Sequence, residues 1–424
     1  MKFTFISNAC GVFTFSRGTR LLMDPWLDDG VFEGSWCHCP PLKTTHQDLQ
    51  NVDAIYLSHI HPDHYDERFF DYPKNIPIFI LKSKYKFLLR NLTKKGYTNV
   101  IEVESGTPQD FREATLTIFS PFSSHIFHES NIGNLIDSAL VVEDSDGTSA
   151  FNANDNTPDI NSCKILRNKY GSFDLAMINY NAAGPYPSCF RNLSDEEKVN
   201  AHNSVLSRNI KHLIECCDIL KPKAILPFAG AYVIGGKEYK KNKYLGTMTW
   251  DQCAQEIQKQ STHNTLTLRE GDSYDLLLGK SDTPYKPIST TDQDHYISET
   301  LSKLKYPYEL DEPIKGSELR KKVDASILAL RERAQKYNLK VIISRRSLVG
   351  ALISRYCHIL SDKNHRHFNE ISKLEPNEGF KKSLIFETKS GTTLRPIDYF
   401  YNWLKDWEYQ ISSKKLDFLV LDYE

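Results

Sequence analysis

The sequence predicts an α/β protein, and three observations support that prediction. Short apolar segments of strand length alternate with amphipathic helical segments through the first 280 residues. The chain has 424 residues, which is enough for two domains and a sizeable buried core. Its 40% hydrophobic and 25% charged residues are typical of a globular protein.

Charge, apolar runs and cysteines exclude several classes of protein. The formal net charge of -1 argues against a protein that coats nucleic acid or an anionic membrane, because that work needs surplus Lys and Arg. No apolar run approaches the ~20 residues that cross a bilayer, and the start of the chain alternates like a strand. Nine cysteines without a repeated spacing indicate a reducing compartment. We therefore expect a cytoplasmic protein that acts on a small-molecule substrate, without nucleic acid or a transmembrane segment, and a homo-oligomer is compatible with this.

Strands and helices are expected in a regular order along the first part of the chain. The predicted strands are 2–7, 12–16, 20–23, 54–57, 78–81, 100–103, 116–119, 139–143, 148–152, 175–179, 224–228 and 274–278, with a short one near Leu266. Helices are expected at 84–94, 195–220 and 250–259. The second of these has the clearest start, because Ser194 and Glu197 form a capping-box pattern.

The sequence changes character near 279–291, where it becomes polar and rich in turn residues. We place a domain boundary there, with one domain at 1–280 and a C-terminal extension at 281–424. The extension contains a charged helical segment at 318–336 and predicted strands at 341–344, 383–387 and 418–421. We interpret it as a substrate cap or an interaction module.

The strongest chemical signal is the segment His59-Ile60-His61-Pro62-Asp63-His64, which directly follows an apolar strand. A strand end is rigid, so a loop that leaves it can turn several side chains to one point. Neutral imidazole and carboxylate are ligands of zinc, iron and manganese. The alternative, a solvated His-rich loop, gives no reason for a carboxylate crowded between histidines. We expect one or two divalent metal ions here, zinc first, with iron or manganese as alternatives.

The order His-x-His-x-Asp-His after an apolar strand resembles the metallo-β-lactamase superfamily. The resemblance covers roughly residues 1–278 and implies a four-layer αββα sandwich with the site at one edge. It also implies that His59 and His61 share one metal with a distant third histidine. Asp63 and His64 then hold a second metal, with a carboxylate that bridges the two.

The later ligands follow from the same resemblance. The third histidine is expected in the loop before strand 139–143, where His128 is favoured over His125. The bridging carboxylate is expected after the next strand, and Asp155 stands there; the alternative is an ordinary Asp of a turn. The family's last histidine is absent, because Phe228-Ala229-Gly230 occupies that position.

Three further motifs of the chain resemble one branch of the superfamily. Met23-Asp24-Pro25-Trp26, Asn181-Ala182-Ala183-Gly184 and Pro227-Phe228-Ala229-Gly230 resemble the metallo-β-lactamase-like part of CMP-N-acetylneuraminate hydroxylase and its bacterial relatives. That family also carries a Rieske iron–sulfur domain. Here Cys37-His38-Cys39 has no second half at Rieske spacing, so we expect a loop with free thiols rather than a cluster.

A metal held by His59, His61 and His128 leaves a position for water, and metal binding lowers the pKa of that water towards ~7. Asp63 and Asp155 are the catalytic candidates, to hold the water and deliver its proton. The first hypothesis is a metal-dependent hydrolase of an ester, lactone, amide or phosphodiester bond. The alternatives are a non-haem iron oxygenase or hydroxylase on the same fold, and a non-catalytic binding protein that keeps the fold.

Candidate substrate contacts lie on loops after the late strands. Tyr186 and Tyr232 are expected on the same rim as the metals, and Lys237 begins a basic loop that runs to Lys243. Such a loop suits a phosphate or carboxylate, although a run of like charges is more often a solvated face. The resemblance implies a sugar-phosphate or nucleotide-sugar type of substrate.

Overall fold

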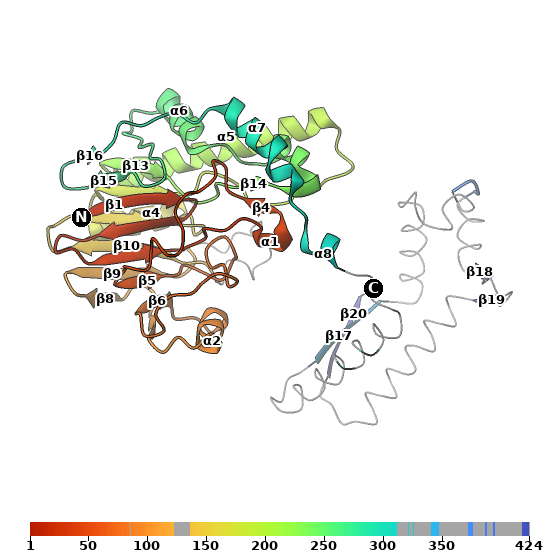
Figure 1. Cartoon of the computed structure of the whole chain (residues 1–424), viewed down its shortest axis with the longest axis horizontal. Coiled ribbons are helices and arrows are strands. Elements are labelled where there is room, and N and C mark those ends of the chain that lie inside the picture. Colours follow the sequence, from red (N-terminus) through yellow and green to blue (C-terminus); the bar gives the residue numbers. More distant parts are fainter. Residues whose placement is uncertain are drawn as a thin grey trace. The chain divides into compact units, whose positions relative to one another are not determined.

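Two β-sheets, one of eight strands and one of six, form the centre of the chain in the computed structural model (Figure 1). The structure describes residues 1–84, 86–122 and 136–311, and beyond them 321, 325, 341–346, 372–375, 386–387, 393–394 and 418–423. The chain divides into two compact units, Met1–Asp311 and Glu312–Glu424, and both sheets lie in the first. The predicted domains, 1–280 and 281–424, stay a prediction.

The larger sheet has the strand order β16-β15-β1-β2-β3-β5-β6-β7. Its strands are β1 (Lys2–Ser7), β2 (Cys10–Thr14), β3 (Arg20–Met23), β5 (Ala54–Tyr56), β6 (Ile78–Leu81), β7 (Val100–Val103), β15 (Ser273–Asp275) and β16 (Lys280–Ser281). β1 to β3 form an antiparallel meander, whereas β3, β5, β6 and β7 run parallel. Successive side chains alternate between two cores, as the pleat requires: Leu21 and Tyr56 belong to one, Leu22 and Ile55 to the other.

The smaller sheet has the order β13-β12-β11-β10-β9-β8. Its strands are β8 (Pro108–Phe111), β9 (Ala114–Phe119), β10 (Ala139–Asp144), β11 (Ser149–Asn152), β12 (Leu175–Ile178) and β13 (Ala224–Pro227). β8 to β11 pair antiparallel, and β11 to β13 pair parallel. Parallel neighbours need a crossover connection, and helices supply it on both occasions.

Helices cover the outer faces of the two sheets. They are α2 (Phe87–Lys94), α4 (Ile160–Tyr170), α5 (Asp195–Leu220) and α6 (Trp250–Gln260). α4, α5 and α6 place Leu166, Leu213 and Ile257 in the core that contains the smaller sheet, while Leu92 of α2 packs in the core outside the larger sheet. α5 and α6 lie above the sheets in Figure 1 and α2 below them. The predicted four-layer αββα sandwich is confirmed.

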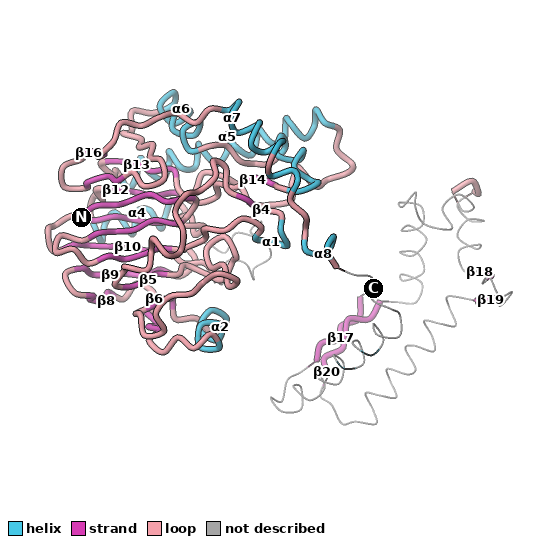
Figure 2. Tube along the Cα trace, in the orientation of Figure 1, coloured by secondary structure: helices cyan, strands magenta, loops and turns pink. Residues whose placement is uncertain are grey.

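Shorter elements complete the first unit (Figure 2). They are α1 (Val31–Gly34), β4 (Trp36–Cys37), β14 (Val233–Ile234), η1 (Gly236–Tyr244), α7 (Thr290–Glu299), η2 (Leu301–Lys303) and α8 (Pro307–Leu310). β4 and β14 pair antiparallel and tie the segment before the His-rich loop to the segment after β13.

In the second unit two strand pairs are described. β17 (Val341–Arg346) runs parallel to β20 (Phe418–Tyr423), and β18 (Phe386–Glu387) pairs antiparallel with β19 (Thr393–Leu394). Most of the predicted helix 318–336 lies outside the described residues. None of the helices in the described ranges combines the length and apolar character that a bilayer crossing requires.

The start of α5 agrees with the sequence prediction. The Ser194 hydroxyl accepts a hydrogen bond from the backbone N–H of Glu197, and the Glu197 carboxylate accepts one from the N–H of Ser194 at 2.7 Å. Two of the four unpaired N–H groups of the first turn are satisfied in this way. Since α5 covers the smaller sheet, its register also fixes how Leu213 and Leu220 pack on that sheet.

Replacing Ser194 with Ala should lower the free energy of unfolding by about 1 kcal/mol, because an N-cap hydroxyl is worth roughly that much. Chemical denaturation followed by circular dichroism measures the change. Ser204→Ala, the same substitution at an exposed position inside α5, is the matched control and should be neutral or slightly stabilising. Equal effects of the two substitutions would contradict the capping role.

Candidate metal centre

The His-rich loop begins where β5 ends in the larger sheet. Backbone N–H groups of His64 and Tyr65 both bond the carbonyl of His61, at 3.0 and 2.8 Å, so the loop turns tightly. The turn brings the rings of His59 and His64 to 4.1 Å between centroids and those of His59 and His61 to 4.5 Å. His59, Asp63 and His64 are buried, and His61 is half-buried.

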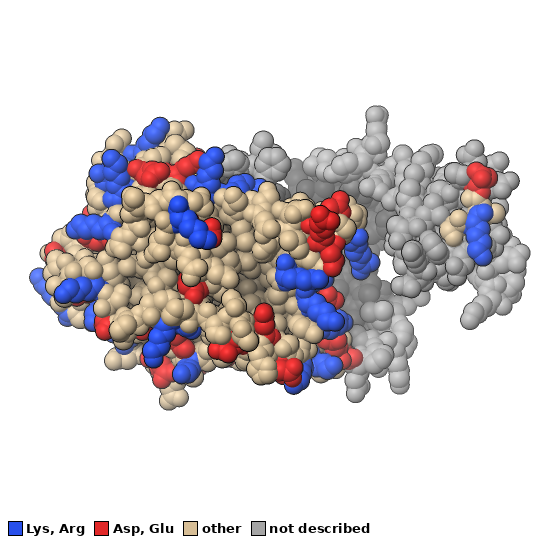
Figure 3. Space-filling model, turned by 90° about the horizontal axis from the view of Figure 1, so that it is seen from above, with Lys and Arg blue, Asp and Glu red and all other residues tan. Residues whose placement is uncertain are grey.

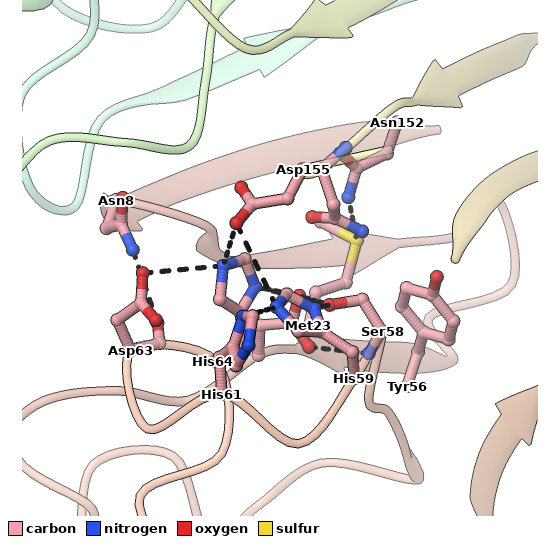
Figure 4. A network of polar contacts seen from close by, with 12 residues as sticks. Asn8, Met23, Tyr56, Ser58, His59, His61, Asp63, His64, Asn152 and Asp155 are labelled. Atoms are coloured by element: carbon pink, nitrogen blue, oxygen red, sulfur yellow. Dashed lines mark hydrogen bonds and ion pairs between the residues drawn. The ribbon is translucent and has the colours of Figure 1, made fainter. Parts of the chain in front are cut away.

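A first group of donor atoms consists of His59, His64 and Asp155 (Figure 4). Oδ2 of Asp155 lies 3.4 Å from Nε2 of His64 and 3.9 Å from Nε2 of His59. Asp63 adds a second carboxylate, with Oδ2 at 3.5 Å from Nε2 of His64. The smaller sheet thus contributes Asp155 to a cluster whose other members come from the larger sheet.

A second group consists of His59, His61 and Asp137. Nε2 of His59 lies 2.8 Å from Nδ1 of His61 and 3.7 Å from Oδ1 of Asp137. Asp137 is buried and lies directly before β10, at the same edge of the smaller sheet as the end of β11. His59 therefore belongs to both groups.

These separations fit a metal ion. Donors bonded to one ion at about 2.1 Å in a tetrahedral arrangement stand roughly 3.4 Å apart. Four of the five nitrogen and oxygen pairs lie between 3.4 and 3.9 Å. Nε2 of His64 is buried and faces the carboxylates of Asp63 and Asp155 at 3.5 and 3.4 Å, so it is placed as a ligand atom. Imidazole with carboxylate is also the donor set of zinc, iron and manganese sites.

The buried carboxylate of Asp24 orients the two buried histidines. It accepts hydrogen bonds from the N–H of Ser58 at 2.8 Å, from the Ser58 hydroxyl at 2.6 Å and from Nδ1 of His64 at 2.9 Å. Since the Ser58 hydroxyl gives its proton to Asp24, it accepts from Nδ1 of His59, 2.9 Å away. In their neutral form both imidazoles are then protonated at Nδ1, and both present an unprotonated Nε2 to the cluster.

The charges around the cluster favour a cation at its centre. Burial alone lowers the pKa of His64, but Asp155, Asp63 and Asp24 raise it well above the ordinary value. Burial, followed by the charge of His64, lowers the pKa of His59 well below its ordinary value. The carboxylates thus stabilise one positive charge beside His64, and repulsion discourages a second proton on His59.

The pKa values of two carboxylates of the cluster shift in opposite directions. Burial raises the pKa of Asp63 to about 6, and Asp155 adds to this while His64 opposes it. Burial would also raise the pKa of Asp155, but the charge and hydrogen bond of His64, with His59 and His61, lower it below its usual range. Asp155 is therefore ionised at neutral pH, and Asp63 is the carboxyl group that exchanges a proton most readily.

Neighbouring side chains fix the ligands from the smaller sheet. Nδ2 of Asn179, directly after β12, donates to Oδ1 of Asp155 at 3.2 Å and leaves Oδ2 turned to the histidines. Beside Asp137, the Ser138 hydroxyl donates to the Ser58 carbonyl at 2.6 Å and lies 2.8 Å from the hydroxyl of Tyr56. A chain of hydrogen bonds therefore ties the start of β10 to the end of β5.

The position of the family's last histidine is closed by backbone. Gly230 has φ +82, and a Cβ there would lie 2.9 Å from Cβ of Asn181 and 3.5 Å from Nδ2 of Asn179. The turn is tied to Asn8, whose carbonyl accepts from the N–H of Ala229 and whose Oδ1 accepts from the N–H of Ala231. A side chain at 230 has no room to reach the cluster.

The predicted metal ligands have two outcomes, and two further residues join the site. His59, His61, Asp63, His64 and Asp155 lie together in the cluster. His128 and its alternative His125 lie outside the described residues, so their part stays a prediction. Asp137 and Asp24 were not predicted as site residues. In the sequence, Asp137 is marked only by its place just before a predicted strand, and the resemblance pointed to a histidine in that loop.

The predicted substrate residues are spread more widely. Tyr186 is 46% exposed on the loop after β12. Tyr232 is buried and stacks on Trp36 at 3.5 Å between ring centroids, and burial, with the charge of Asp63, raises its pKa. Nζ of Lys237 lies 3.2 Å from the carboxylate of Glu309 and over the ring of Tyr308. Of these three residues, Tyr232 is the one whose pKa is shifted by a residue of the cluster.

An αββα sandwich with a His/Asp cluster at its strand ends defines a metallo-β-lactamase type of protein. Residues 19–228 match the profile of the beta-lactamase superfamily domain. Residues 19–228 of this chain therefore carry a domain of this superfamily.

Curated relatives share part of the chain. A predicted Rieske 2Fe-2S iron-sulfur protein of Mycolicibacterium smegmatis is 30% identical over 201 residues, which cover 45% of this chain and 36% of that protein. Cytidine monophosphate-N-acetylneuraminic acid hydroxylase of Danio rerio is 26% identical over 280 residues, 62% of this chain and 44% of the hydroxylase. The match thus spans less than half the length of either relative.

Solved structures resemble the first unit at low sequence identity. An isothiocyanate hydrolase from Delia radicum gut bacteria is 20% identical with a TM-score of 0.48, covering 65% of this chain and 99% of that one. CmlA, a diiron β-hydroxylase from Streptomyces venezuelae, is 17% identical with a TM-score of 0.42, covering 63% and 53%.

Replacing Asp24 with Asn should weaken metal binding about 10–100-fold, because one of the two accepting oxygens becomes an NH2 donor and the negative charge that holds the Nδ1 proton of His64 is lost. Titration of metal-free protein against a chelator of known affinity measures this. Asp71→Asn, the same change at a side chain that is 85% exposed, is the control and should leave affinity unchanged. Unaltered affinity in Asp24→Asn would refute the orienting role.

Proposed function

We propose that this protein is a metal-dependent hydrolase of a small molecule. The convergence of His59 and His64 with Asp155 and Asp137 at 3.4 to 3.9 Å supports this proposal, because nothing in packing requires so many ligand groups at one point. The matched superfamily domain covers all of these residues. The bond would be an ester, lactone, amide or phosphodiester, as metal-activated water attacks all four.

The residues divide between two ion positions. One ion would be held by His59, His61 and Asp137, and a second by Asp63, His64 and Asp155. A bound divalent cation lowers the pKa of its water and polarises an oxygen of the substrate. In this proposal Asp137 is a further ligand of the ion for which the sequence suggested His128, and His128 stays a prediction.

The remaining chemistry is proton transfer by the carboxylates. Oδ2 of Asp155 faces the histidines while Asn179 holds Oδ1, so Asp155 is placed to orient a water by accepting its hydrogen bond. Asp63 lies beside it and has a pKa of about 6, which suits a group that takes up a proton and returns it near neutral pH. With one ion bound, Asp63 is free to pass that proton to the leaving group. With two ions, it becomes a ligand.

The substrate class comes from one relative. The hydroxylase of Danio rerio is named for a nucleotide sugar, and a sugar-phosphate or nucleotide-sugar type of substrate is proposed here by that likeness. Tyr186, Tyr232 and Lys237 are the proposed contacts. A cytoplasmic location and a homo-oligomeric state belong to the same proposal.

A non-haem iron oxygenase is the second candidate, and the donor set favours it. Three of the six proposed ligands are carboxylates, and oxygen-rich sites suit iron and manganese at least as well as zinc. Both curated relatives named above carry redox names, one for an iron–sulfur protein and one for a hydroxylase. That reaction would also need an electron donor.

Replacing His61 with Ala should remove at least about half of the bound metal and nearly all activity, because His61 is a proposed ligand of one ion. Elemental analysis of protein purified without chelator gives the stoichiometry. His295→Ala, an exposed histidine of α7 outside the cluster, should keep full metal content. Full metal content in His61→Ala would exclude it as a ligand.

The identity of the metal separates the two candidates. We expect zinc or manganese at one to two ions per chain, with turnover of ester or phosphodiester substrates that does not depend on oxygen. Stoichiometric iron in protein purified anaerobically, together with oxygen uptake when a reductant is added, would instead establish the oxygenase. Protein that holds no metal and turns over no substrate would leave the non-catalytic binding protein.

A further inference from the structure

A cavity of about 460 Å³ lies beside the metal cluster and is not part of it. Its volume falls in the range of small-molecule sites, roughly 300–1,000 Å³. One wall is apolar and includes Ile6, Pro40, Leu42 and Trp250. The indole ring of Trp250 packs on Phe5, and its Nε1 is buried without a hydrogen-bond partner in the described ranges. The wall therefore offers an apolar surface to a ligand.

The rest of the lining is charged, and its charge is positive. Lys43, Arg269 and Lys286 line the cavity together with one acid, Glu270. Neither lysine has an ion pair among the described residues, and both are exposed. Arg269 is held in place because its guanidinium donates to the carbonyls of Lys286 and Pro287.

The single acid of the lining is already engaged. Oε1 of Glu270 accepts hydrogen bonds from the backbone N–H groups of Lys43 and Thr44. These bonds hold the segment that contains Lys43 against the turn that contains Arg269. Glu270 therefore positions the cations and is less available to neutralise them.

The cavity and the metal cluster share the turn between β1 and β2. Ser7 and Ala231 line the cavity, and Asn8 follows Ser7. The side chain of Asn8 donates to the carbonyl of Asp63 at 3.2 Å and accepts from the N–H of Ala231 at 2.9 Å. Asn8 thus connects the wall of the cavity with the loop that contains Asp63.

The basic loop after β14 is less suited to an anion. Lys237, Lys241 and Lys243 are paired with Glu309, Glu238 and Asp195 respectively. On the face shown in Figure 3, basic and acidic side chains are interspersed over the coloured residues. Unpaired lysines on a concave, partly apolar surface are the feature that sets the cavity apart from that loop.

We propose that this cavity binds a small organic anion, with its phosphate or carboxylate group between Lys43 and Lys286 and its apolar body against Leu42 and Trp250. The proposal deepens the proposed function and rests on it in one respect, since the bound anion would be part of the substrate. The indole ring of Trp250 and the positive charges of the two lysines together match a substrate with a flat or hydrophobic body and one acidic end.

Phenylphosphonate is a suitable probe, because its carbon–phosphorus bond resists hydrolysis. Isothermal titration calorimetry on the full chain as purified should show binding that weakens as salt is added. The double variant Lys43→Glu, Lys286→Glu should bind about tenfold more weakly or worse, because two attractions become repulsions. Lys240→Glu, Lys241→Glu makes the same charge change on the basic loop and should bind like the original protein.

The His61→Ala variant separates the cavity from the metal. It should lose metal and keep phenylphosphonate binding, which tests the metal centre and the cavity independently. Failure of the first result counts against the metal centre alone. The cavity proposal is overturned by absence of binding to the original protein, by unchanged affinity in the Lys43/Lys286 variant, by an equal loss in the Lys240/Lys241 variant, or by loss of binding in His61→Ala.

Discussion

The hydrogen bonds of Asp24 are the interaction on which the rest of the metal centre depends. Its carboxylate is fully enclosed at the end of β3 and accepts three hydrogen bonds from the neighbouring end of β5 and from His64. A buried carboxylate without hydrogen-bond partners would destabilise the folded state. The three donors therefore stabilise Asp24, and Asp24 in turn orients them. Through Ser58 the same carboxylate sets the tautomer of His59. One charge in the larger sheet therefore decides which nitrogen atoms face the cluster.

The ligand groups of the two sheets meet at one shared edge. β3 and β5 run parallel, as do β11, β12 and β13, and the residues that follow their carboxyl ends are Asp24, His59, Asp155, Asn179 and Gly230. Each sheet alone supplies part of a ligand set. The hydrogen bonds of Ser138 to Ser58 and Tyr56 hold the sheets together at the place where the ligand sets combine. The distance between the two sheets therefore sets how far the donor atoms of one sheet lie from those of the other.

Strands and caps with strong local signals could be predicted from the sequence. The strand before His59 is a short apolar run, and α5 starts at a reciprocal cap between Ser194 and Glu197, so both follow from neighbouring residues. α4 was not predicted because it buries little more than Cys163 and Leu166. Its local signals are at its ends, where the Asp159 side chain accepts from the N–H of Ser162 and Gly171 follows the last residue, while its interior lacks a clear apolar stripe.

The ligand set shows the same limit. His59 to His64 are close in sequence, so their proximity needs only one turn. Asp137 is more than seventy residues away, and an aspartate before a strand is common in any protein. Only the antiparallel pairing of β10 with β11 brings it to the edge where Asp155 ends its own strand. The tautomers set by Asp24 are equally invisible in the sequence, because they depend on hydrogen bonds between different strands.

The closed turn at Gly230 connects the cluster with the cavity. Where a histidine would complete the second ion position, the backbone at φ +82 packs against Asn181 and is fastened to Asn8. The same Asn8 bonds the carbonyl of Asp63 and precedes the bend into β2, while Ala231, directly after Gly230, lines the cavity. A backbone turn without a side chain at 230 therefore stands where the resemblance places a histidine, and the hydrogen bonds of Asn8 tie that turn both to the loop of Asp63 and to the wall of the cavity.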